Sequence, residues 1–134
     1  MTEKLIKNNL IDFFQKESDI TLCILYGSAA SNKLSSTSDV DIAIGANILL
    51  SPDKMAEIQI RITSQLSREV DVIDVRRAQG PFLQQILTKG EFLVKKDTNL
   101  YAQLLRRMWY FNADMRKNYD YIVQKQVGRF LDGS

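Results

Sequence analysis

Helix-type and strand-type patterns alternate along the first 97 residues, and this order restricts the fold more than any other property of the sequence. Apolar residues recur at helical spacing over about residues 3–16, after Pro52 and again after Pro81. Short runs typical of strands lie between and after these segments: Thr21–Tyr26, Val40–Ile44, Val70–Val75 and Glu91–Val94. The order predicts an α/β (α+β) domain, with a small mixed sheet and helices packed mainly on one of its faces.

The segment that follows differs in composition. Residues 98–134 have a helical pattern and carry six basic residues against three acidic ones. We therefore predict a domain over residues 1–97 and a C-terminal helical extension over residues 98–134. We interpret Trp109 and the tyrosines of the extension as packing residues. Its basic residues are a candidate surface for a partner or for a second copy of the chain.

The chain of 134 residues contains no histidine, and Cys23 is its only cysteine. These counts exclude catalytic Ser-His-Asp and Cys-His sites, histidine-ligated zinc and an internal disulfide. Cys23 lies within an apolar run, which predicts a buried and inert thiol. Any catalytic chemistry must therefore rest on carboxylates, hydroxyls, lysines or arginines.

Charge and hydropathy bound the partners. The formal net charge is +2, which is too small to indicate nucleic-acid binding by itself. No uncharged apolar stretch approaches the ~20 residues that span a bilayer, and Met1–Lys4 is not typical of a signal peptide. We expect a cytoplasmic protein that makes no contact with a membrane.

Three aspartates occupy strand-like positions. Asp39 and Asp41 are two residues apart, so their side chains leave the same face of one strand, and Asp71 lies on a later strand. Converging carboxylates suit Mg²⁺ or Mn²⁺, and such sites support two-metal phosphoryl or nucleotidyl transfer. The alternative is a polar sheet face that carries an Asp-x-Asp pattern without any function. Asp74 is a rival third acid, but it points to the opposite face from Asp71.

Gly27 and Ser28 follow the first strand directly and precede a short polar loop. Glycine allows the backbone to approach a phosphate closely, and a hydroxyl with backbone N–H groups favours an anion. An isolated Gly-Ser is also typical of an ordinary turn, and the sequence has no P-loop pattern.

Taken together, these segments resemble the nucleotidyltransferase superfamily of DNA polymerase β, and within it the minimal nucleotidyltransferase (MNT) group. The resemblance covers about residues 5–97 and is carried by two segments, LYGSAASNKLSSTSDVDIAI and REVDVIDVRRA. The family signature is Gly-Ser, a spacer, Asp-x-Asp and a later third acid. Ala29 and Asn32 depart from residues common in the family, which affects substrate details rather than the metal site.

The resemblance implies a role for each motif residue. Gly27 and Ser28 would bind the triphosphate of ATP, with Ser28 at its β/γ end. Asp39, Asp41 and Asp71 would be catalytic and would ligate two Mg²⁺ ions, or Mn²⁺, and Asp71 would also help to take the proton of the acceptor. Asp74 stays the alternative third carboxylate. Arg76 and Arg77 are either nucleotide-binding residues or solvated surface arginines.

The resemblance also implies a function. MNT proteins are usually encoded beside a HEPN-domain protein, so we expect the antitoxin of a type VII-like HEPN/MNT toxin–antitoxin system. It would transfer AMP from ATP to a tyrosine of the HEPN RNase toxin and thereby neutralise it, with no direct contact to nucleic acid. One alternative is an antitoxin that acts by binding only. The other is a nucleotidyltransferase that modifies a small molecule such as an antibiotic.

Overall fold

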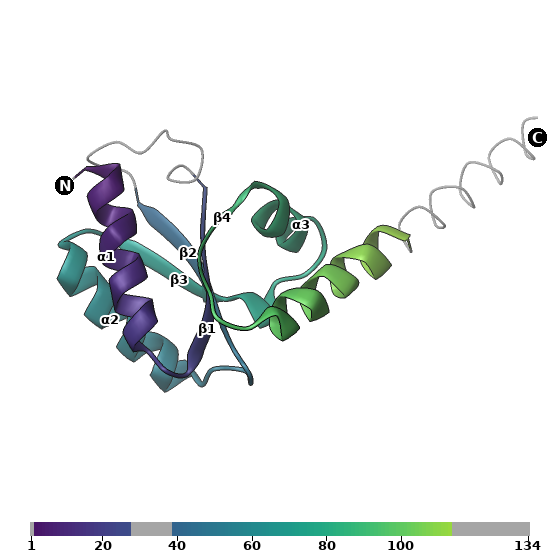
Figure 1. Ribbon diagram of the computed structural model, residues 1–134, viewed down its shortest axis with the longest axis horizontal. Coiled ribbons are helices and arrows are strands. Elements are labelled where there is room, and N and C mark those ends of the chain that lie inside the picture. The colour runs from purple at the N-terminus through teal and green to yellow at the C-terminus, as the bar shows by residue number, and fades with distance from the viewer. Residues whose placement is uncertain (1, 28–38, 114–134) are drawn as a thin grey trace, which may run out of the picture.

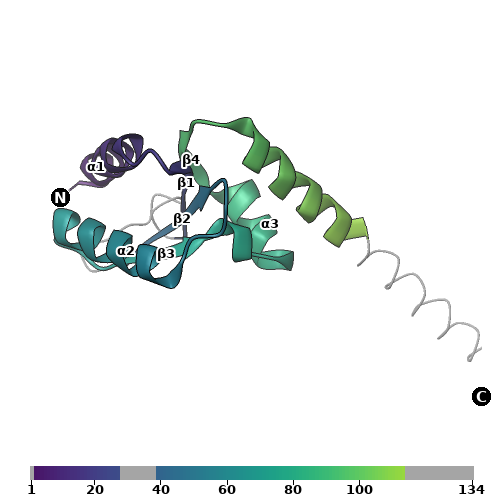
Figure 2. The same cartoon turned by 90° about the horizontal axis from the view of Figure 1, so that it is seen from below.

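A sheet lies between two layers of helices in the computed structural model, which describes residues 2–27 and 39–113 (Figure 2). Figure 1 labels the elements along the chain. They are α1 (Glu3–Lys16), β1 (Ile20–Tyr26), β2 (Val40–Ala46), α2 (Pro52–Leu66), β3 (Val70–Asp74), the short 3-10 turn η1 (Val75–Arg77), α3 (Gly80–Lys89) and β4 (Glu91–Lys95). A further helix covers residues 98–113.

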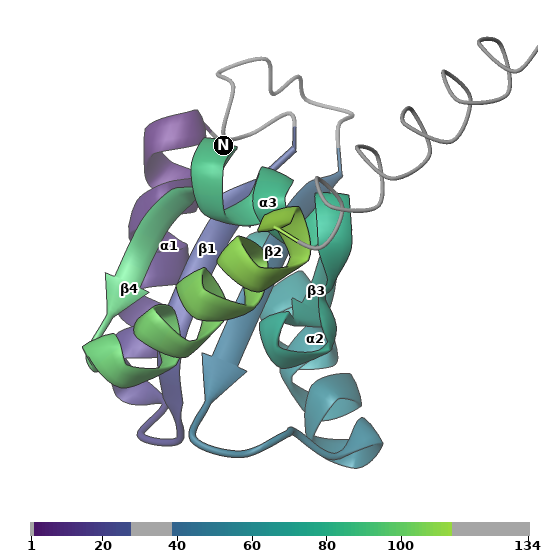
Figure 3. The ribbon, with the colours of Figure 1, turned by 90° about the vertical axis from the view of Figure 1, so that its right-hand side faces the viewer.

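The described strands form one sheet in the order β3-β2-β1-β4. β1 pairs antiparallel with both β2 and β4, whereas β2 and β3 are parallel. The predicted mixed sheet is therefore confirmed. Figure 3 shows β4, β1, β2 and β3 side by side, with β3 at one edge.

Helices cover both faces of the sheet, which corrects the prediction that they pack mainly on one face. α1 and α2 lie on one face, and α3 and the helix over 98–113 lie on the other (Figures 2 and 3). The reason lies in β1, where Cys23 and Leu25 join the α1–α2 core while Leu22 and Ile24 join the α3 core. A strand that is apolar on both sides needs cover on both sides.

The helix starts follow from local sequence. At α2 the Ser51 hydroxyl accepts a hydrogen bond from the Lys54 N–H at 3.1 Å, and Pro52 is the first helical residue. Thr2 caps α1 in the same way through the Leu5 N–H. These caps fix where each helix begins over the α1–α2 face.

The helix over residues 98–113 shares the α3 core. Leu104 is fully buried there, and Leu100 lies against Gly45 of β2, where an added Cβ would clash with it. The Arg107 guanidinium donates a hydrogen bond to the Arg76 carbonyl at 2.6 Å. Residues 98–113 thus form part of the same packed unit, and the domain boundary at residue 97 stays a prediction. Residues 114–134 of the predicted extension lie outside the described residues.

The aromatic residues of this helix divide into two groups. The Tyr101 ring packs edge-on against Phe92 with 5.0 Å between centroids, as a packing residue should. Trp109 and Tyr110 are 71% and 67% exposed, so the packing interpretation is wrong for these two.

Cys23 is buried and free, as expected, and burial raises the pKa of its thiol. No helix among the described residues has the length and apolar character that crossing a membrane requires.

Candidate active site

Strand register brings two of the predicted acids together at one end of the sheet. Asp41 of β2 lies directly opposite Asp71 of the parallel strand β3. On its other side Asp41 lies opposite Tyr26, the last residue of the antiparallel strand β1. Because directly paired residues share a face, all three side chains belong to the α3 face. The end of β1 and the beginnings of β2 and β3 lie at the same end of the sheet (Figure 3). The register places Asp41 there, between Tyr26 and Asp71.

Gly27 lies against the Asp41 carboxylate. Its φ is +72°, a left-handed conformation that glycine adopts without strain. A Cβ at this position would lie only 2.6 Å from Asp41 Oδ2. The bare backbone turn is thus in direct contact with an acidic group. Ser28, the second predicted phosphate-binding residue, lies outside the described residues.

The acids interact electrostatically. The pKa of Asp41 is raised, first because burial removes solvent from its carboxylate, and then because of the negative charges of Asp71 and Asp39. Partial burial and the charges of Asp41 and Asp71 raise the pKa of Tyr26 to about 12, so its hydroxyl keeps its proton at neutral pH. The site is a focus of negative charge that a cation would relieve.

The donor set suits magnesium. Asp39 is exposed just before β2 and contributes to the field at Asp41. Within residues 2–27 and 39–113, no three acidic, thiol or imidazole groups gather closely enough to hold one ion. Mg²⁺ commonly takes one or two carboxylates and completes its shell with water and substrate phosphates, so the Asp41–Asp71 pair is sufficient. The Asp41–Asp71 pair therefore fits such an ion, whereas Asp39 does not join the pair in a three-ligand group in this structure.

A pH titration tests whether the negative charge of Asp41 destabilises the folded state. Because the pKa of Asp41 is higher in the folded state than its usual 3.8, the native state binds more protons between the two values. Stability should therefore fall as pH rises through that window. We expect Asp41→Asn to remove the loss, so that the variant is more stable than wild type above the window and equal to it below. Urea unfolding in EDTA from acidic to neutral pH measures this. Equal stabilities of Asp41→Asn and wild type at neutral pH would contradict this expectation. Saturating Mg²⁺ should reduce the difference in stability between the two proteins.

Asp74, the rival third acid, is held by hydrogen bonds from the backbone. Asp74 is buried, and its two carboxylate oxygens accept hydrogen bonds from the N–H groups of Leu50, at 2.9 Å, and Arg76, at 3.0 Å. It lies opposite Ile44 in the β2–β3 register, three residues along the strands from the Asp41–Asp71 pair. Its contacts fix the β2–α2 loop to η1.

Arg76 is also held by backbone groups. Its guanidinium donates to the carbonyls of Ala46, at 2.6 Å, and Asn47, at 2.7 Å, where β2 ends. The acids lie where β2 begins, so Arg76 is directed to the wrong end of the strand to bind a phosphate beside them. Arg77 is exposed at the outer side of β3.

Sequence reasoning missed two aromatic residues at the site. Tyr26 lies opposite Asp41, and its ring packs edge-on against Phe82 of α3 with 5.8 Å between centroids. Phe82 is 46% exposed. The only sequence signal was that Tyr26 directly precedes Gly27. The approach of Phe82 depends on how α3 crosses the sheet.

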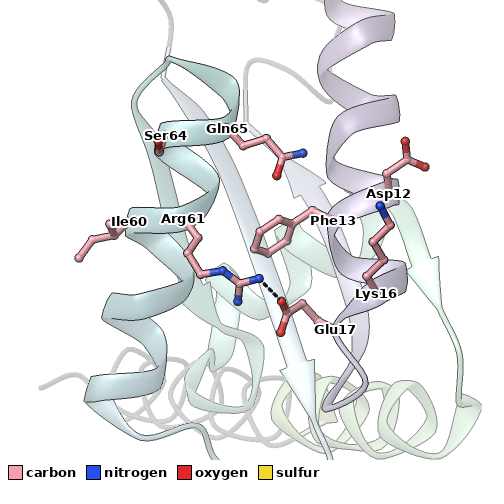
Figure 4. Close-up of a pocket in the computed structure, with 8 residues that line it drawn as sticks. All are labelled: Asp12, Phe13, Lys16, Glu17, Ile60, Arg61, Ser64 and Gln65. Atoms are coloured by element: carbon pink, nitrogen blue, oxygen red, sulfur yellow. Dashed lines mark ion pairs between the residues drawn. The ribbon is translucent and has the colours of Figure 1, made fainter.

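Another hollow lies on the opposite face, between α1 and α2 (Figure 4). Arg61 is bound there by Glu17 at 2.7 Å and lies over the Phe13 ring at 4.9 Å. The predicted acids belong to the other face of the sheet, so this hollow is separate from them.

Comparisons with known proteins agree with this fold. Residues 8–99 match the family described as polymerase beta, nucleotidyltransferase. Over 101 residues the chain is 30% identical to the protein adenylyltransferase MntA of Shewanella oneidensis, covering 74% of this chain and 68% of that protein.

Two solved structures share the fold. One is a toxin–antitoxin complex with AMP-PNP, in which the similar chain has a TM-score of 0.71 at 22% identity, covering 90% of this chain and 98% of that one. The other is a complex of tri-AMPylated Shewanella oneidensis HEPN toxin with MNT antitoxin, with a TM-score of 0.68 at 21% identity and coverage of 94% and 99%. With the family match over most of its length and the shared fold, this chain belongs to the polymerase beta nucleotidyltransferase family.

Proposed function

We propose that this chain is a metal-dependent protein adenylyltransferase that modifies a tyrosine of a HEPN-domain RNase toxin and so acts as its antitoxin. The observation that supports this most is the pairing of Asp41 with Asp71 beside the Gly27 turn. The relative with 30% identity is itself named a protein adenylyltransferase. Addition of AMP would bring negative charge and bulk to the toxin and thereby oppose RNA binding. We also propose a cytoplasmic location, because the reaction consumes ATP and its target is an RNase.

The proposed reaction is an in-line displacement at the α-phosphorus of ATP. The oxygen of the acceptor hydroxyl forms a bond to this phosphorus, and the bond from phosphorus to the oxygen that bridges to the β-phosphate breaks. Pyrophosphate leaves with that electron pair. Asp71, the more exposed of the paired acids, takes the proton of the hydroxyl.

The remaining residues bind and orient. Gly27 and Ser28 would hold the triphosphate through the backbone of the turn and the serine hydroxyl. Asp39, Asp41 and Asp71 would hold two Mg²⁺ ions, or Mn²⁺, which when bound neutralise charge on the α-phosphate and on the leaving pyrophosphate. Tyr26 stays protonated beside Asp41 and adds no charge to the site.

The decisive experiment uses the purified chain, Mg²⁺ and ATP labelled at its α-phosphate. The acceptor is the HEPN-domain protein encoded beside this chain. We expect the label to appear on a tyrosine of that protein and its RNase activity to fall with the extent of labelling. A toxin that is neutralised without label would instead support an antitoxin that only binds. Transfer to a small hydroxyl compound without a partner protein would support a small-molecule nucleotidyltransferase.

A substitution at Gly27 tests the contact between turn and acid. In Gly27→Ala the new Cβ meets Asp41, and the positive φ adds strain, so we expect a stability loss of about 1–2 kcal/mol and weaker ATP binding. Urea unfolding and ATP titration measure the two effects.

Gly27→Asn is the matched control, because asparagine tolerates this backbone conformation better than alanine does. We expect it to recover part of the stability but not the ATP affinity, since its Cβ meets the same carboxylate. ATP affinity at the wild-type value in either variant would contradict the proposed role of the turn.

A further inference from the structure

A groove runs along the outer side of β3, the strand at one edge of the sheet. Its walls come from β3, α2, α3 and the segment between η1 and α3. They include Met55, Val72, Ile73, Arg77, Gln79 and Phe82. Most of these side chains are apolar, whereas Arg77 and Gln79 are exposed and form a polar rim. The buried Asp74 also lines the groove, and its carboxylate oxygens accept hydrogen bonds from backbone N–H groups. The groove therefore suits an apolar or aromatic group that has a polar end.

The groove begins beside the paired acids. Ile73 is two residues beyond Asp71 on the same face of β3, which corresponds to about 7 Å along the strand. Phe82, on the α3 side, packs against Tyr26, which lies opposite Asp41. Ile73 and Phe82 thus connect the groove with the acids, so a group bound there would reach them.

The in-line geometry of the proposed reaction also places the acceptor hydroxyl on the side of the site where the groove lies. The leaving and attacking oxygens lie on opposite sides of the phosphorus in such a displacement. The Gly27 turn, which would hold the leaving pyrophosphate, lies at the end of β1, whereas the acids lie on β2 and β3. Since the strand order is β3-β2-β1, the attacking hydroxyl would approach from beyond β3, where the groove lies.

We propose that this groove is the acceptor subsite and binds the ring of the tyrosine that receives AMP, together with an acidic residue of the toxin near it. This inference rests on the proposed function. The apolar walls and Phe82 fit a phenol ring, whose hydroxyl would then point toward Asp71. Arg77 at the rim supplies the positive charge that complements an acidic neighbour.

The test fills the groove without touching the acids. Gln79 is exposed and has an extended backbone, with φ −143° and ψ 163°, which accepts tryptophan without strain. We expect Gln79→Trp to raise the KM for the HEPN protein by about tenfold or more and to leave the KM for ATP and kcat near wild type. Gln85→Trp places the same side chain at an exposed position of α3 that does not line the groove, and it should change none of these constants.

Arg77→Glu provides a second variant that does not depend on the first one folding. It should also raise the KM for the HEPN protein, because it places negative charge beside the acidic residue of the acceptor. An unchanged acceptor KM in both variants would overturn the subsite and leave the proposed function standing. A wild-type chain that transfers no AMP to the HEPN protein would overturn both proposals.

Discussion

The Asp41→Asn variant is expected to transfer AMP at least about 10²–10³-fold more slowly than wild type while it remains folded. Asp41 is the central acid, opposite Asp71 on one side and Tyr26 on the other, and its carboxylate also contacts the Gly27 turn. An amide keeps the shape of the side chain but removes the negative charge that would bind a divalent cation. The initial rate of label transfer to the HEPN protein measures the loss.

The same assay separates the two candidates for the third acid. We expect Asp71→Asn to lose activity to a similar extent and to retain its stability, because Asp71 is exposed. Asp74→Asn should lose about 1–3 kcal/mol of stability, since its new amide group would face a backbone N–H, and should keep its activity per folded molecule. The reverse pattern would identify Asp74 as the third acid.

Measurements of stability and activity together show whether a variant loses activity only because it is unfolded. The environment of Asp41 disfavours the charged form of its carboxylate, as the raised pKa indicates. An Asp41→Asn chain that is inactive and yet at least as stable as wild type would locate the defect in chemistry or cation binding. Wild-type activity in this variant would remove the basis of the proposed mechanism.

Local signals predicted the elements that shape the site. The Ser51–Pro52 pair gave the start of α2, because capping and the fixed φ of proline act within one turn. The alternation after Asp39 gave the face on which Asp41 lies, because side-chain direction in a strand depends only on parity. These features depend on a few neighbouring residues, and a single sequence contains them.

Features set by register and packing could not be predicted in the same way. Which residue lies opposite Asp41 depends on how three strands align, so the nearness of Asp71 was a hypothesis and that of Tyr26 was missed. The cover on both faces depends on where α3 and the helix over 98–113 return to the sheet. Arg76 shows the same limit, because it binds carbonyls that lie 29 and 30 residues away in the sequence.

The second large effect concerns the helix over residues 98–113. Leu104 is fully buried in the α3 core, so Leu104→Ala should lower the free energy of unfolding by about 2–5 kcal/mol. Trp109→Ala removes a larger side chain from the same helix. Because Trp109 is 71% exposed, we expect it to change stability by no more than about 0.5 kcal/mol. Urea unfolding of the whole chain, followed by circular dichroism, measures both.

This contrast tests whether the extension can be separated from the domain. If residues 1–97 folded independently of the segment after them, Leu104→Ala would leave the main unfolding transition where it is in wild type. The contacts of Leu100 with Gly45 and of Phe111 with Gly80 predict instead a single cooperative transition that shifts as a whole. Trp109 would then be a surface residue on a helix held firmly by the core, and its substitution should affect binding of the HEPN protein more than folding.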